Sequence, residues 1–259
     1  RDVAVTGVQT CALPIFYRGE ARPLAHPVDF ACFVALFPHQ LAGPIIRYWS
    51  IAEQIRHRSF TWEKFARGAA FLCIGMGKKI LLANPMAHIA DSVFGAASLR
   101  WFDAWFGVIA YAFQIYFDFS AYSDMAVGLA LMLGFLFTKN FNDPYRAQNI
   151  TDFCRRWHIS LGGFFREYVY IPLGGNRHHQ TRNIFVVWAL TGAWHGASWN
   201  FVLWGLYFAV FLLLEKNGLL RLLGVLPRLV QHLYALFFIV LGWGLFYFTD
   251  LPRLGASLR

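Results

Sequence analysis

Long apolar stretches separated by short basic segments are the feature that most limits how this chain can fold. Two of them, Trp101–Phe137 and Ile184–Glu215, are longer than the roughly 20 apolar residues that one membrane-spanning helix needs. Apolar residues make up 58% of the chain and charged residues 14%, and a soluble protein of this length could not bury so much apolar surface in one core. We therefore expect an all-α, polytopic transmembrane helical protein that has the lipid bilayer as its solvent.

The apolar stretches predict helices that are not all simple spans. Phe30–Ile46 contains two prolines and a histidine and predicts a broken or re-entrant helix, whereas Phe65–Asn84 predicts a more regular one. Trp101–Phe137 predicts two helices or one long bent helix, because its length exceeds one span at about 1.5 Å per residue. Ile184–Glu215 is also too long for a single span, and Leu229–Phe248 predicts the last span.

The stretch Thr138–Arg182 is basic rather than apolar, and it contains amphipathic pieces such as Ile150–Tyr170. Basic residues favour the cytoplasmic side of a membrane protein, so we expect an interfacial or re-entrant region facing the cytoplasm. The net charge of +9 is explained in this way, and we expect no nucleic-acid partner. Within the stretch, the proline and glycine pair of Tyr170–Arg177 predict a tight loop that ends the preceding helix.

The first residues stand apart from the rest of the chain. Val5–Ile15 can be back-translated into a common short-read sequencing adapter, so we expect residues 1–15 to be an assembly artefact with no place in the fold. Residues 16–259 are expected to form one transmembrane domain, a fragment that is truncated at its N-terminus and also at its C-terminus.

His195 lies near the middle of the apolar stretch Ile184–Glu215. Ionisable groups at membrane depth are costly, so they usually face a protein interior or a water-filled cavity. Removal from water favours the neutral imidazole, which can take a proton from a hydroxyl as a general base in acyl transfer. Gly192 and Gly196, on either side, would allow close approach of backbone or substrate and could mark a helix break. The simpler alternative is a histidine hydrogen-bonded between helices.

His158 follows the pair Arg155-Arg156 and precedes a short apolar run. It could line the cytoplasmic mouth of a tunnel, with the two guanidinium groups holding a phosphate-bearing donor such as coenzyme A. The alternative is an interfacial anchor, in which the arginines contact lipid head groups and Trp157 lies in the aromatic belt.

A third polar group lies in the middle of the stretch Trp101–Phe137. Asp118 and Asp124 are six residues apart and would not share a face of one helix. Together with Ser120 they could line a polar cavity or cap a helix break. Structural support for the site is the favoured interpretation, and paired-carboxylate hydrolysis is disfavoured.

The cysteines and the loop histidines do not predict a metal site. The cysteines are widely spaced and are interpreted as small buried hydrophobic residues, apart from Cys11 in the adapter-like segment. His178 and His179 are interpreted as solvated loop residues, because no second spaced pair accompanies them.

Taken together, these segments resemble the membrane-bound O-acyltransferase family, and most of all the bacterial branch that includes alginate O-acetyltransferase and the D-alanyl transferase of teichoic acid. The resemblance covers about Phe30 to Phe248 and depends on the order and spacing of several short motifs. These are Phe37-Pro38-His39, Ala42-Gly43-Pro44-Ile45, Gln114–Asp124, Asn140-Phe141-Asn142, Pro144-Tyr145, Arg155–Leu161, Tyr170–Arg177 and Trp194-His195-Gly196.

The resemblance implies a helical membrane fold with re-entrant helices around a tunnel, in the inner (cytoplasmic) membrane of a bacterial cell. It implies that His195 corresponds to the near-invariant family histidine and His158 to a second polar position. Acetyl-CoA is then the expected cytoplasmic donor, with no other cofactor bound. The acceptors would be a partner protein on the extracytoplasmic side and a polysaccharide hydroxyl. We assign substrate contacts to Arg155, Arg156, Trp194, Asn200, Asp118 and Ser120.

Other functions remain open at this level. Within the family, the chain could transfer D-alanyl or other acyl groups to teichoic acid, protein or lipid. A transporter would predict internal repeats and a coupling-ion site, and neither pattern is visible in the sequence. A haem-binding membrane protein could use His158 and His195 as axial ligands.

Overall fold

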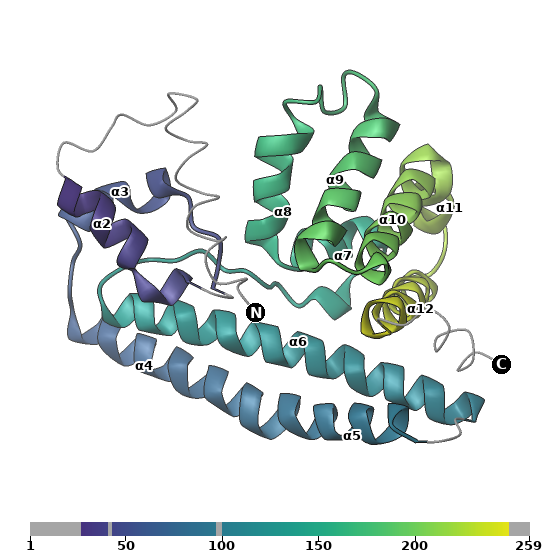
Figure 1. Ribbon diagram of the computed structural model, residues 1–259, viewed down its shortest axis with the longest axis horizontal. Helices are drawn as coiled ribbons and strands as arrows, with labels where there is room; N and C mark the ends of the chain where they lie inside the picture. The colour runs from purple at the N-terminus through teal and green to yellow at the C-terminus, as the bar shows by residue number, and fades with distance from the viewer. Residues whose placement is uncertain (1–26, 41–42, 97–99, 249–259) are drawn as a thin grey trace. The chain divides into compact units, whose positions relative to one another are not determined.

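The computed structural model describes residues 27–40, 43–96 and 100–248, and their regular structure is entirely helical (Figure 1). The all-α prediction is thus confirmed for these residues, while the adapter-like residues 1–15 lie outside them. The helices are α2 (Pro27–Ala35), α3 (Tyr48–Arg56), α4 (Trp62–Gly77), α5 (Asn84–Phe94), α6 (Trp101–Met132), α7 (Ile150–Arg156), α8 (Ile159–Phe165), α9 (Gln180–His195), α10 (Trp199–Leu214), α11 (Leu220–Gly224) and α12 (Arg228–Tyr247).

One described helix, α12, is long and apolar enough to cross a membrane by length and composition. It matches the predicted span Leu229–Phe248 almost residue for residue. The other apolar stretches contain shorter helices or helices with several polar residues, so the polytopic arrangement and the tunnel stay predictions.

The chain divides into two compact units, and each is described by itself. The first unit contains residues 1–81 and 117–140, and the second contains residues 82–116 and 141–259. Helix α6 passes from the second unit into the first.

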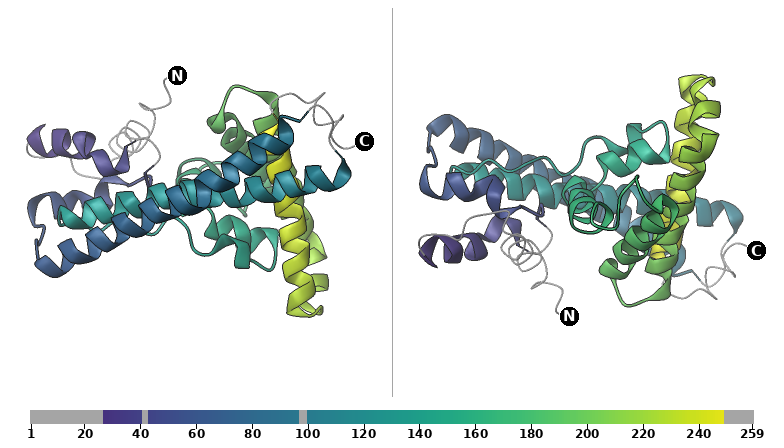
Figure 2. Two further views of the ribbon diagram at one scale, coloured as in Figure 1. Left: turned by 90° about the horizontal axis from the view of Figure 1, so that it is seen from below. Right: turned by 90° about the horizontal axis from the view of Figure 1, so that it is seen from above.

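In the first unit, α4 lies alongside the second half of α6 (Figure 2). The two helices approach closely because glycines stand at the contact: a Cβ on Gly68 would lie 2.6 Å from the carbonyl oxygen of Gly128. Helix α4 continues through a π-helical segment, Lys78–Ala83, into α5. The helical stretch is therefore longer than the predicted helix Phe65–Asn84.

The predicted break in Phe30–Ile46 is confirmed, because α2 ends at Ala35 and a 3-10 turn, Phe37–His39, follows.

In the second unit, α9 and α10 form a hairpin that breaks the long apolar stretch at Gly196, as its glycines predicted. A Cβ on Gly192 would collide with the carbonyl oxygen of Phe201, and a Cβ on Gly205 would collide with that of Trp188. Glycines on both helices therefore permit a crossing too close for any larger residue.

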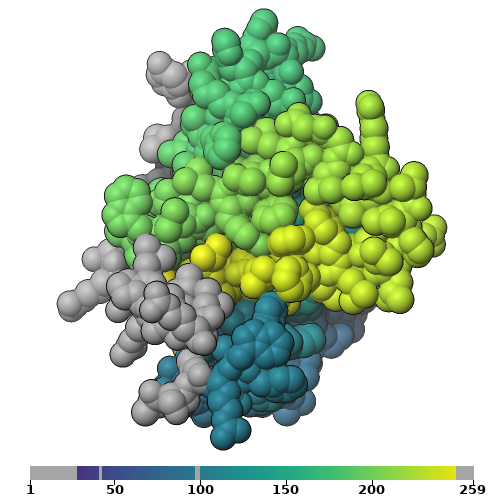
Figure 3. Space-filling model, turned by 90° about the vertical axis from the view of Figure 1, so that its right-hand side faces the viewer, coloured from purple at the N-terminus to yellow at the C-terminus, as the bar shows by residue number. Residues whose placement is uncertain are grey.

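The core of the second unit joins α7, α10 and α12. Phe208, Ile239 and Ile150 are fully buried in it, and Trp204 and Trp243 stack with their ring centroids 5.8 Å apart. Figure 3 shows α12, in yellow, between the α10–α11 segment and the start of α6. This packing holds the ends of α7, α9 and α10 near one another.

The basic region Thr138–Arg182 folds as short helices and turns. Helices α7 and α8 are followed by a π-helical turn, Arg166–Tyr170, and then by the predicted tight loop. In this loop Gly174 and Gly175 have φ values of 103° and 55°, which glycine adopts without the steric cost of a Cβ. Of the two alternatives predicted for Trp101–Phe137, the structure shows the single long helix, α6.

Candidate active site

His195 is the last residue of α9, at the turn into α10, and it lies in an aromatic cage. Its ring meets those of Trp204 and Phe246 edge to face, each with a centroid distance of 5.2 Å, and that of Trp194 at 5.0 Å. Among the described residues, none forms a hydrogen bond with its imidazole. Within the part of the chain that the structure describes, both ring nitrogens are therefore available to a substrate.

His158 lies between α7 and α8 in a conformation that is rare for its residue type. Its φ of 45° is in the left-handed region, and its side chain is 4% exposed. Ser160 Oγ lies 3.4 Å from Nδ1, and the rings of Phe141 and Trp194 flank the imidazole at 6.2 and 6.0 Å. Strained backbone of this kind is common at functional sites, because it aims a side chain in a direction that a regular helix would not.

His158 belongs to the basic region, outside the expected membrane spans. Burial lowers the pKa of His158 below its ordinary value, and the neighbouring His195 lowers it further. The imidazole is therefore neutral near pH 7, with one nitrogen that donates and one that accepts hydrogen bonds.

The two histidines line one cavity with a volume of about 590 Å³. The cationic side chains of Arg155, Arg166 and Lys216 belong to the same lining, as do apolar side chains such as Phe208 and Leu212. The cavity thus combines two imidazoles, positive charge and an apolar wall. This combination suits a substrate that has an anionic part and a reacting group sheltered from water.

The neighbouring arginines have different surroundings. Arg155 is exposed and lines the cavity, and its contact with a substrate stays a prediction. Arg156 instead forms an ion pair with Asp152, with an Nε–Oδ1 distance of 2.8 Å, and donates a hydrogen bond to the carbonyl oxygen of Asn142 at 3.3 Å. Its observed contacts hold the region around α7 together.

Trp194 and Asn200 are near His195 without belonging to the cavity lining as described. The ring of Trp194 lies 6.0 Å from that of His158 and 5.0 Å from that of His195, and Trp194 is 36% exposed. Asn200 is buried, and its Nδ2 donates a hydrogen bond to the carbonyl oxygen of Phe246 at 3.0 Å, which links α10 to α12. The substrate contacts of both residues stay predictions.

Asp118 and Ser120 lie in the first unit. Asp118 forms an ion pair with Lys79, and Asp124 forms one with Lys78, each with an N–O distance of 2.5 Å. Ser120 is 2% exposed, and its hydroxyl has no hydrogen-bond partner among the described residues. The ion pairs fit the favoured interpretation of this group as structural support.

Two buried polar residues, Asn183 and Glu215, are absent from the sequence-based predictions. Asn183 donates hydrogen bonds to the carbonyl oxygens of Leu173, Gly175 and His178 and so closes the tight loop. Glu215 accepts hydrogen bonds at the start of α7. The only signal in the sequence was one acidic residue at the end of a long apolar stretch, which also suits a simple helix terminus.

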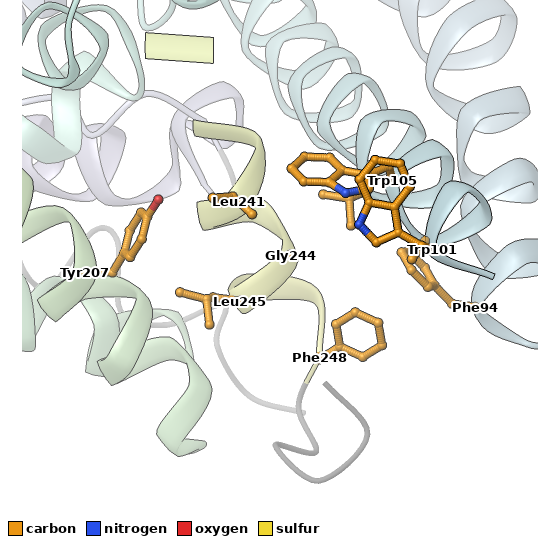
Figure 4. Close-up of a pocket in the computed structure, with 10 residues that line it drawn as sticks. Phe94, Trp101, Trp105, Tyr207, Leu241, Gly244, Leu245 and Phe248 are labelled. Carbon is orange, nitrogen blue, oxygen red and sulfur yellow. The ribbon is translucent and has the colours of Figure 1, made fainter. Parts of the chain in front are cut away.

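A separate apolar pocket of about 240 Å³ lies between α6, α10 and α12 (Figure 4). Trp101, Trp105, Leu241 and Phe248 line it, and within the described linings it shares no residue with the histidine cavity. The hydroxyl of Tyr207 donates to the carbonyl oxygen of Phe238. Because its walls offer almost no polar group, this pocket is not the candidate for acid–base chemistry.

Comparison with known proteins points to one family. Residues 20–251 match the model of the membrane-bound O-acyltransferase family. The chain is 45% identical to the probable alginate O-acetylase AlgI of Azotobacter vinelandii, over 89% of this chain and 47% of the relative. It is 40% identical to the peptidoglycan O-acetyltransferase of Helicobacter pylori, over 86% and 44%. It is 27% identical to the teichoic acid D-alanyltransferase of Bacillus subtilis, over 70% and 49%. The chain therefore spans about half the length of these curated relatives.

Proposed function

This chain belongs to the membrane-bound O-acyltransferase family, and from that premise we propose that it contributes the histidine site of an enzyme that moves an acetyl group from a thioester to a hydroxyl. The observation that carries the proposal is the single cavity lined by His158, His195 and Arg155. It brings a proton acceptor, a neutral hydrogen-bonding group and a cation to one space, as acyl transfer from an anionic donor requires.

In the proposed reaction, His195 takes the proton of the acceptor hydroxyl while the oxygen attacks the thioester carbonyl carbon. The new C–O bond forms, the C–S bond breaks, and the departing sulfur receives the proton from the His195 imidazolium. His158 orients the donor or donates a hydrogen bond to the oxyanion that develops at the carbonyl. The aromatic cage around His195 keeps bulk water from competing with the acceptor.

We propose acetyl-CoA as the donor and an extracytoplasmic polysaccharide as the final acceptor, reached through a partner protein. Support comes from the relatives whose names specify alginate and peptidoglycan O-acetylation. Arg155 would face the donor phosphates, since guanidinium groups match phosphate geometry. Location in the bacterial inner membrane as a multi-pass protein is part of the same proposal, and the family membership of the chain supports the membrane location.

The test is acetyl transfer in membranes of bacteria that express the gene at full length, with radiolabelled acetyl-CoA. We expect His195→Ala to lower transfer by about 100-fold or more, the usual effect of losing general-base catalysis. His57→Ala, on an exposed residue of the first unit, is the matched control and should leave transfer unchanged. Wild-type transfer in the His195→Ala membranes would contradict the assignment.

D-alanyl transfer is the second candidate, because the teichoic acid D-alanyltransferase of Bacillus subtilis is among the relatives. The same membranes, given a D-alanyl thioester in place of acetyl-CoA, distinguish the two. Transfer of D-alanine but not acetate would replace the donor proposed above while leaving the role of His195 in place.

A further inference from the structure

Glu215 is a buried carboxylate that the proposed mechanism does not use. It is 1% exposed and lies where α10 passes into the π-helical segment Glu215–Leu219. Its Oε1 accepts hydrogen bonds from the backbone N–H of Ile150 at 2.7 Å and from the hydroxyl of Tyr234 at 3.2 Å. Its Oε2 accepts from the backbone N–H and the hydroxyl of Thr151, at 2.8 and 2.6 Å.

These hydrogen bonds fix the first turn of α7 to the end of α10. The next free N–H of that turn, on Asp152, donates to Asn149 Oδ1 at 2.7 Å, so the turn is held at successive residues. Helix α7 has only seven residues, from Ile150 to Arg156, and fixing its start therefore fixes the direction of the whole helix. Arg155 lies on that helix, and His158 lies two residues beyond its end.

The residue after Glu215 also belongs to the site. Lys216 lines the histidine cavity together with Arg155, and its Nζ lies 6.0 Å from the ring centroid of Tyr170. One peptide unit thus joins a carboxylate that holds α7 to a cation that faces the cavity. The hydrogen bonds of this carboxylate therefore connect the helix of Arg155 to the residue next to Lys216.

We propose that Glu215 is a positioning residue that sets the spacing of the cavity cations Arg155 and Lys216 for the anionic part of the donor. The inference rests on the proposed acyl transfer and assigns the donor's phosphates to these two side chains. A carboxylate is suited to this task because it only accepts hydrogen bonds, and all of its observed partners donate. A glutamine would turn an N–H toward one of those donors.

The test compares Glu215→Gln and Tyr234→Phe with a matched control, Tyr207→Phe. Tyr207 also bridges α10 and α12, through a hydrogen bond to the carbonyl oxygen of Phe238 at 2.8 Å, but it has no described contact with Glu215. Each full-length variant is assayed with acetyl-CoA and with acetyl-pantetheine, which presents the same thioester without phosphates.

For Glu215→Gln we expect the KM for acetyl-CoA to rise about tenfold, the loss expected for a charge-assisted hydrogen bond, with little change in the KM for acetyl-pantetheine. Tyr234→Phe should give about a twofold rise, and Tyr207→Phe none. A Glu215 that served folding alone would lower the yield of active enzyme and leave both KM values as in the wild type. That result, or an equal rise for both donors, would overturn the proposal.

A second measurement does not depend on catalysis. Cys154 lies on α7 and lines the cavity, so its rate of modification by a maleimide, followed in a variant whose exposed cysteines are replaced by serine, reports how firmly α7 is held. Burial and the charge of Glu215 raise the pKa of the Cys154 thiol, so the variant compared is Tyr234→Phe, which keeps that charge and removes one hydrogen bond to the carboxylate. We expect faster modification in Tyr234→Phe than in the wild type and an unchanged rate in Tyr207→Phe. An unchanged rate in Tyr234→Phe would overturn the positioning role even if no acetyl transfer were found, whereas absent transfer with faster modification would contradict only the proposed function.

Discussion

At the scale of single residues, His158 combines two properties that its sequence position did not reveal. Its backbone is left-handed, and its imidazole is buried and neutral. The neighbouring Arg155-Arg156 pair would rather suggest a charged surface at this point. Both properties arise from the turn between α7 and α8, which places the side chain under the rings of Phe141 and Trp194.

This geometry predicts an unusual tolerance at position 158. His158→Asn should keep a measurable part of the activity, because a neutral amide can also hydrogen-bond and asparagine accepts positive φ values. His158→Leu should lose about 100-fold or more, since it offers no hydrogen bond and is strained in this conformation. The measurement is the rate of acetyl transfer in membranes with matched protein levels.

The lowered pKa of His158 also predicts how the activity of His158→Asn, relative to that of the wild type, depends on pH. An imidazole with a lowered pKa loses its proton at a more acidic pH, so it stays neutral from pH 8 down through pH 6.5, the ordinary midpoint. The ratio of His158→Asn to wild-type activity should therefore be constant between about pH 6 and pH 8. A ratio that changes around pH 6.5 would show that the charged imidazole takes part.

The site residues differ in how far the sequence could identify them. His195 could be identified from the sequence because an ionisable residue within an apolar stretch is conspicuous, and the order of the motifs supported His158. Glu215 could not be identified in this way, because its hydrogen-bond partner Ile150 is 65 residues away along the chain. Likewise, nothing in the pair Arg155-Arg156 indicates that one side chain lines the cavity while the other pairs with Asp152.

At the scale of elements, the hairpin of α9 and α10 places His195 at its turn. The glycine pattern predicted the break at Gly196, because a helix interior rarely contains glycines so near one another. The pattern could not predict that α4 continues through the π-helical segment Lys78–Ala83, since its residues fit α- and π-helical hydrogen bonding equally.

Close packing in this hairpin makes Gly205 a sensitive position. Gly205→Ala should destabilise the protein by about 1–3 kcal/mol, because the added Cβ would collide with the carbonyl oxygen of Trp188 and force the helices apart. Gly224→Ala is the matched control, since its Cβ would have no heavy atom within 4 Å. Thermal unfolding of the detergent-solubilised variants measures the difference. Equal melting temperatures for the two variants would contradict the proposed crossing.

At the scale of the whole molecule, the sequence composition predicts more membrane-spanning helices than the described residues contain. Composition predicts a polytopic protein from the sum of all apolar stretches. The structure contains one helix, α12, that meets the criteria of length and apolarity within the described residues. The difference arises because breaks such as that at Gly196 divide some apolar stretches into helices shorter than a simple span, while the long helix α6 contains several polar residues.

Membrane extraction separates insertion from surface attachment. A basic protein with a net charge of +9 that is bound only to anionic lipid should be released by high salt. We expect this protein to remain in the membrane pellet after both high salt and alkaline carbonate and to dissolve only in detergent. Release by either wash would contradict the expected integral insertion.

The two ion pairs of the first unit have a consequence for how that unit can enter lipid. Lys78 with Asp124 and Lys79 with Asp118 bring two positive and two negative charges together, so these charges balance where the π-helical continuation of α4 meets α6. Neither helix could enter an apolar phase alone without carrying two unbalanced charges. The helices are therefore expected to insert as a preassembled pair, because the lysines must meet their aspartate partners before they enter lipid.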